Sequence, residues 1–139
     1  MIKIIIIAHC SLASELVKSV QTISGKQSNL YSIEQGLNDS LEEMKLRIET
    51  AIKDIDNKDG ALLLVDMFGG TPCNASAHHI CTDLKVEVIS GVNLPMIISA
   101  VMFSQTDMSL SELANKVLDR GQKSIINIRN ILRNHQSIN

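Results

Sequence analysis

Short apolar runs alternate along the chain with longer segments in which apolar residues recur every three or four positions. The runs are rich in Ile, Leu and Val and are bounded by polar residues or glycine, which is typical of strands buried on both faces of a sheet. Four strands are predicted on this pattern, at 2–8, 30–33, 61–65 and 85–89.

The longer segments carry helix-start and helix-stop signals as well as helical spacing. The expected helices and their signals are 12–23 between Ser11 and Gly25, 41–55 after Asn38 or Asp39, 72–82 from Pro72, 96–103 after Pro95, and 110–118 after Ser109 or Ser111 and closed by Gly121. This order of elements predicts an α/β doubly wound parallel sheet of strand order 2-1-3-4, with helices on both faces.

The 139 residues are expected to form one domain, because a chain of this length can bury a core without disulfides. That core is aliphatic, since the aromatic residues are Tyr31, Phe68 and Phe103. Five methionines are expected to fill gaps in it, at positions 44, 67, 96, 102 and 108.

The segment 124–132 fits two structures. Ile126 and Ile128 would share one face of a strand, whereas Ile125, Ile128 and Leu132 fit a helix. We favour a C-terminal edge strand, because a strand that follows the parallel units could bury its apolar face against a symmetric partner.

Charge and cysteine content exclude several classes of protein. The net charge of −2 and the pI near 6.0 argue against nucleic-acid binding, which needs clustered Lys and Arg. Three cysteines without zinc-site spacing fit a reducing cytosol. The apolar start is too short to span a membrane and ends at His9, so we expect a cytoplasmic protein that does not insert into a bilayer.

His9 and Asp66 each follow an apolar strand at its first polar position. In the order 2-1-3-4, strands one and three are neighbours, so their carboxyl ends flank the topological switch point. We therefore expect the two side chains to meet. A carboxylate that accepts a proton from one imidazole nitrogen leaves the other with an exposed lone pair, which makes the histidine a nucleophile or a base.

Two helix starts are expected beside this pair, one near Ser11 and one at Thr71. Backbone N–H groups there, the Thr71 hydroxyl and Gly70 in the Gly-Gly turn form a site suited to a dianionic group. The combination predicts a histidine that carries a phosphoryl group. No GxxxxGK[ST] motif indicates ATP, and we expect no cofactor and no metal.

Two other readings of these residues are weaker. Cys10 could be a thiolate nucleophile at a helix start, but the C-x5-R pattern of phosphatases is absent, since position 16 is Leu. His78 and His79, with Cys73 and Cys81, could suggest a metal site. Adjacent histidines on a helix point about 100° apart, however, which disfavours shared coordination.

Three motifs together resemble the enzyme IIA component of the mannose-type bacterial phosphotransferase system. They are the apolar strand ending at His9 with SLASEL after Cys10, D-M-F-G-G-T-P-C-N-A from Asp66, and G-V-N-L-P-M from Gly91. The resemblance implies a phosphocarrier in which His9 accepts a phosphoryl group from HPr and passes it to a IIB component. That component serves a membrane sugar permease with IIC and IID subunits.

The resemblance also implies roles for single residues. Asp66 would orient His9, Thr71 would contact the phosphoryl group, and Phe68 would lie on the rim where partners dock. The family usually has glycine where this chain has Cys10. A glycine there could permit a positive φ or the close approach of a phosphate, so Cys10 is expected either to accept that backbone or to lower activity. Family members form homodimers by exchanging the C-terminal strand, which implies that 122–139 is partly an exchange segment or tail.

Two alternatives remain open from the sequence. The chain could be the related phosphotransferase subunit of dihydroxyacetone kinase systems, although the G-G-T-P-x-N string disfavours this. It could also be a sensor domain that binds regulators according to its phosphorylation state.

Overall fold

The computed structural model describes residues 1–53, 58–82 and 85–138. Its sheet contains four strands, β1 (Lys3–His9), β2 (Leu30–Gln35), β3 (Ala61–Val65) and β4 (Val86–Ser90). All described pairings are parallel, and the order is β2-β1-β3-β4, as predicted. The helices are α1 (Leu12–Ser24), α2 (Leu41–Lys53), α3 (Thr71–Thr82), α4 (Leu94–Phe103), α5 (Leu110–Lys123) and α6 (Ile128–Ile138).

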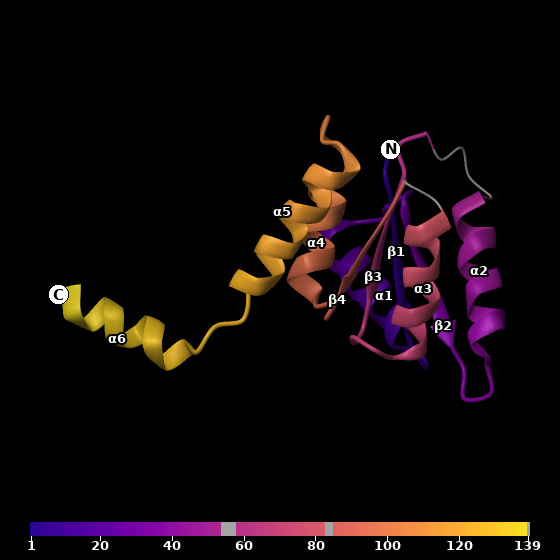
Figure 1. Ribbon diagram of the computed structural model, residues 1–139. Helices are drawn as coiled ribbons and strands as arrows, with labels where there is room; N and C mark the ends of the chain where they lie inside the picture. Colours follow the sequence, from indigo (N-terminus) through magenta and orange to yellow (C-terminus); the bar gives the residue numbers. More distant parts are fainter. Residues whose placement is uncertain (54–57, 83–84, 139) are drawn as a thin grey trace.

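The two central strands divide the core into two layers because successive side chains point to opposite faces. Ile4, Ile6, Leu62 and Leu64 pack with residues of α1, α4 and α5, whereas the alternate residues from Ile5 to Val65 pack with α2 and α3. Figure 1 shows α2 and α3 on one side of the sheet and α4 with α5 on the other. Burial on both faces accounts for the unbroken apolar runs of β1 and β3.

Helix starts follow local capping chemistry, with one correction to the prediction. The cap of α2 is Ser40 and not Asn38 or Asp39, because Ser40 and Glu43 exchange the side-chain to backbone bonds of a capping box. Asp39 instead pairs with Arg47. Ser109 caps α5 through a second capping box, and the predicted extension of α2 to Ile55 lies outside the described residues.

Gly121 does not close its helix as predicted, since α5 continues to Lys123. It is buried against α4, where an added Cβ would lie 2.3 Å from Met96 Cγ. The glycine therefore serves close helix packing rather than helix termination. Met44 and Met96 are buried as expected, but Met67 and Met102 are exposed, so the prediction of core methionines was wrong at those two positions.

The predicted C-terminal edge strand is wrong. Residues 128–138 form α6, which projects away from the sheet and its covering helices (Figure 1). Residues 125–135 are exposed. A helix satisfies its backbone hydrogen bonds internally, whereas a strand needs a neighbour, and none within the described chain lies beside this segment. The helical alternative of the sequence pattern is the one observed.

Candidate functional site

The register of the central strands brings His9 and Asp66 together. β1 and β3 pair in parallel up to Ile7 and Val65, so the residues that follow emerge at the same edge of the sheet. His9 Nδ1 lies 2.6 Å from Asp66 Oδ2. The predicted meeting of the two side chains is confirmed.

Asp66 is held by three hydrogen bonds from groups at this edge. Its Oδ2 also accepts the backbone N–H of His9 at 2.9 Å, and its Oδ1 accepts the backbone N–H of Met67 at 2.9 Å. A carboxylate fixed in this way selects the tautomer in which His9 Nδ1 donates and Nε2 has a lone pair. The His9 side chain is 43% exposed and that of Asp66 is 11% exposed, so solvent reaches the ring while the carboxylate is nearly enclosed.

The pKa of the Asp66 carboxyl lies below its ordinary value of 3.8. Burial raises the pKa, but the hydrogen bonds from the His9 backbone N–H and from the His9 ring lower it by more in total. The electrostatic interaction with the ring and the hydrogen bond from the Met67 N–H lower it further. Asp66 is therefore a carboxylate at neutral pH.

Gly70 lies against the Cε1–Nε2 edge of the imidazole. A Cβ added at Gly70 would be 3.1 Å from His9 Cε1 and 3.8 Å from Nε2, so glycine lets the backbone approach the ring. The Gly70 carbonyl accepts the N–H of Asn74 at 2.9 Å, which starts α3. The α3 N-terminus is therefore beside His9, where its positive end favours an anion.

Thr71 and Ser11 stand at the starts of the two helices that follow the site strands. Thr71 is the first residue of α3 and is half-buried. Ser11 precedes α1, is exposed, and its hydroxyl makes no capping hydrogen bond. Ser11 therefore lies at the edge of the sheet where an anion site was predicted. Gly70, by contrast, lies directly against the His9 ring.

Cys10 adopts the left-handed backbone conformation, with φ of 53°. Its N–H donates to the carbonyl of Gln35 at 2.7 Å, which ties the turn after β1 to the end of β2. Of the reasons considered for a glycine at this position, positive φ is the one observed, and Cys10 adopts that backbone conformation. An L-residue in this region costs free energy that glycine would not.

Exposed apolar residues follow the site residues in the chain, and we call them the apolar rim. Phe68 is 86% exposed, and Met67 and Leu12 are exposed as well. Phe68 was predicted to lie on a docking rim, whereas Met67 was predicted to fill the core and Leu12 was expected as one of the apolar positions of its helix. Met67 directly precedes Phe68 and Leu12 directly follows Ser11. Their position next to predicted site residues was the sequence signal that could have placed them on the rim.

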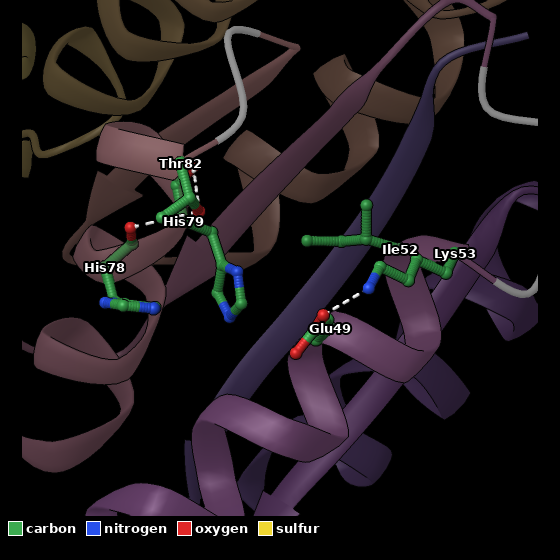
Figure 2. Close-up of a pocket in the computed structure, with 6 residues that line it drawn as sticks. All are labelled: Glu49, Ile52, Lys53, His78, His79 and Thr82. Atoms are coloured by element: carbon green, nitrogen blue, oxygen red, sulfur yellow. Dashed lines mark hydrogen bonds and ion pairs between the residues drawn. The ribbon is translucent and has the colours of Figure 1, made fainter.

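His78 and His79 lie away from this site, toward the other end of α3. Figure 2 shows them with Thr82 on α3, facing Glu49, Ile52 and Lys53 of α2 across a pocket. Their rings meet edge to face, and the buried His79 has Nε2 3.1 Å from the Lys45 carbonyl oxygen. Among the described residues, no three His, Cys, Asp or Glu side chains are grouped to hold a metal ion.

In the described ranges, no helix combines the length and the apolar character needed to cross a bilayer.

Known proteins resemble this chain over most of its length. A family model described as PTS system fructose IIA component, EIIA-man, matches residues 3–118. The chain is 32% identical over 124 residues to the PTS system fructose-specific EIIA component of Bacillus subtilis (strain 168), covering 89% of this chain and 84% of that protein. It is 30% identical over 124 residues to the PTS system mannose-specific EIIAB component of Escherichia coli (strain K12), covering 89% of this chain but 38% of that protein.

A solved structure supports the same relationship. The crystal structure of phosphotransferase system component EIIA from Streptococcus agalactiae superposes with a TM-score of 0.86 at 31% identity. The match covers 94% of this chain and 99% of that chain.

The lowered pKa of Asp66 predicts a specific acid response. Because the folded-state pKa lies below 3.8, the carboxylate contributes stability above that pH, and this contribution is lost as the pH falls through the folded value. A carboxyl ¹³C NMR titration should show Asp66 titrating below 3.8. In His9→Ala the pKa should rise because the ring hydrogen bond is lost, whereas His78→Ala should leave it unchanged. An equal response to both substitutions would contradict the pairing.

The left-handed backbone of Cys10 predicts an unusual order of substitutions. Val at this position should give a free energy of unfolding about 1–2 kcal/mol lower than Gly, because a β-branched residue is strained at positive φ. Urea denaturation of Cys10→Val and Cys10→Gly measures the difference. At Cys81, which is exposed within α3, the same two substitutions should not show this order, since glycine is the poorer helix former. Equal stabilities at position 10 would refute the strain.

Proposed function

This chain belongs to the mannose-type enzyme IIA family of the phosphotransferase system, and from that membership we propose that it is a phosphocarrier. His9 accepts a phosphoryl group from phospho-HPr and passes it to a IIB component, which serves a sugar permease with membrane IIC and IID subunits. The observation that carries the proposal is the 2.6 Å contact between His9 Nδ1 and Asp66 Oδ2 beside Gly70. It leaves Nε2 as the nucleophile.

In the transfer step, the Nε2 lone pair attacks the phosphorus of the incoming phosphohistidine. A P–N bond forms at His9 as the P–N bond of the donor breaks, and the donor imidazole retains that electron pair. The His9 Nδ1 proton remains hydrogen-bonded to Asp66, whose negative charge stabilises the ring as positive charge develops. The same steps in reverse release the phosphoryl group to the next histidine or cysteine acceptor.

The phosphoryl oxygens are bound by groups at the helix starts. The groups we propose are the backbone N–H groups in the first turn of α3, the hydroxyl of Thr71, which begins α3 directly after Gly70, and Ser11 at the start of α1. Phe68 is the central docking residue, with Met67 and Leu12 around it. An exposed aromatic beside the reacting atom is suited to pack against a protein partner.

The relatives favour a sugar carrier over the alternatives. Those reported above are named as fructose- and mannose-specific components, and none is named as a dihydroxyacetone kinase subunit. The carrier works in the cytoplasm, where HPr and IIB are found. Residues 1–139 act as one domain of this type, with 122–139 as its tail.

The proposal is tested by phosphoryl transfer from labelled phosphoenolpyruvate through enzyme I and HPr. His9→Ala should abolish acid-labile labelling, and Asp66→Asn should slow it by about 10²-fold or more, because the carboxylate no longer stabilises the ring cation. Asp107→Asn removes an exposed carboxylate that follows α4 and should have no effect.

Label that moves on to a IIB component marks a carrier. Label that forms on His9 but never leaves it would favour a phosphorylation-dependent sensor. Unchanged labelling of Asp66→Asn would count against the proposed role of the His9–Asp66 pair.

We also propose that the protein is a homodimer. β4 is the last strand of the described sheet, so one edge of it is open, and Ile125 and Ile126 are exposed in the segment between α5 and α6. If the segment with Ile125 and Ile126 of one copy packs on the β4 edge of a second copy, the open edge and the two isoleucines are both covered.

Two truncations test the dimer by multi-angle light scattering. A chain ending before Ser124 should shift toward monomer, because it lacks Ile125 and Ile126. A chain ending before Ile128 keeps them and should remain dimeric. A dimer that persists without residues 124–139 would overturn this assignment.

A further inference from the structure

Gln35 is the residue of β2 that lies beside His9. The two are Cα partners in the parallel register of β1 and β2. The Cys10 N–H donates to the Gln35 carbonyl at 2.7 Å, so the pairing continues to the end of both strands. Neighbouring strands are about 4.8 Å apart, and paired residues of parallel strands project from the same face of the sheet. The imidazole and the amide therefore leave the sheet side by side.

The face that they share is the one on which the site is built. Ile7 and Ile33, two residues earlier on each strand, are paired in register and both pack in the core layer of α2 and α3. Side chains two positions apart on a strand point to the same side, so His9 and Gln35 also face this layer. Gly70, which directly precedes α3, lies against the His9 ring and is consistent with this placement.

Gln35 flanks His9 on the side opposite to Asp66. β1 lies between β2 and β3 in the sheet; Asp66 and Gly70 follow β3, whereas Gln35 ends β2. The contacts of the ring with the Asp66 carboxylate and with Gly70 thus come from the β3 side. Gln35 is the polar side chain that β2 places on the other side.

The amide of Gln35 has one buried end and one accessible end. Its Oε1 is buried and has no hydrogen-bond partner. Its Nε2 forms no hydrogen bond with the described residues and is not among their buried unpartnered atoms, so it is open to solvent and offers two N–H donors. A buried amide oxygen without a partner is rare, because removing it from water costs free energy that an apolar side chain would not. Packing alone therefore does not explain a glutamine at this position.

We propose that the Gln35 side chain binds the phosphoryl group carried by His9, with Nε2–H donating to a phosphoryl oxygen. The inference rests on the proposed phosphocarrier function. The other proposed donors at Thr71 and the first turn of α3 follow β3, so Gln35 adds a donor from the β2 side. A neutral amide binds a phosphoryl group more weakly than Arg or Lys would, which suits a group that must leave again.

Phosphoryl transfer to the full-length protein from labelled phosphoenolpyruvate through enzyme I and HPr tests this role. Gln35→Met keeps the side-chain length and removes both donors, so labelling of His9 should be about 10- to 100-fold slower, as expected for one lost hydrogen bond to a charged group. Gln35→Glu should be slower still, because its carboxylate repels the phosphoryl oxygens. The matched control is Gln105→Glu, which alters an exposed residue near Met1, at the end of the sheet away from His9, and should not change the rate.

Two further measurements separate phosphoryl binding from a structural role. Gln35→Met should unfold at a urea concentration no lower than that of the parent, because it removes a buried acceptor without a partner. In ¹H–¹⁵N spectra, the side-chain NH₂ signals that are lost in Gln35→Met should shift in the parent on phosphorylation, while those of Gln105 stay in place. Labelling of Gln35→Met at the parent rate would overturn the inference, and so would slow labelling that accompanies lost stability without an NH₂ shift.

Failure of this inference and failure of the proposed function give different results. If the parent is labelled by HPr and Gln35→Met is labelled equally well, only the role of Gln35 is wrong. If the parent takes no label from HPr, the phosphocarrier proposal fails. Phosphoramidate, a small phosphoryl donor to histidine, then forms the phosphohistidine without a carrier protein, and an unshifted Gln35 NH₂ signal would refute the inference by itself. A His9 that accepts the group from neither donor would refute both.

Discussion

The hydrogen bond between His9 and Asp66 joins residues that are 57 positions apart, and the site depends on it. It forms because β1 and β3 are neighbours in a sheet whose first connection turns to one side and whose later connections turn to the other. Parallel pairing then places both strand ends at one edge. The aliphatic residues that fix this register thereby place His9 beside the carboxylate that orients its ring.

The buried strands, the turns that follow them and the exposed residues near Phe68 contribute to the site in different ways. Two buried layers hold β1 and β3, so the backbone N–H of His9 and the carboxylate of Asp66 have little freedom. The turns that follow contain the positions with special backbone needs, Cys10 at positive φ and Gly70 against the imidazole. The exposed Phe68 lies outside both, on the surface where we propose that a protein partner docks.

The tail relates to the rest of the molecule in a different way. α6 is exposed, and within the described chain it forms its backbone hydrogen bonds without packing its apolar side chains into the core. α6 is joined to α5 by a short segment and shares no residue with the site at the edge of the sheet.

The sequence by itself determined the four strands, their order, and the positions of His9 and Asp66, because apolar periodicity and capping residues act over a few neighbours. It also indicated a positive φ at Cys10, through the resemblance to a family with glycine there. Only the tertiary structure decided that Asp66 also binds the His9 backbone, that Gly121 packs on Met96, and that the tail is a helix. The first two features depend on contacts between segments distant in the sequence, and the tail is a helix where no neighbouring strand lies beside it. A local pattern does not contain this information, because the spacing of the tail isoleucines fits a strand as well as a helix.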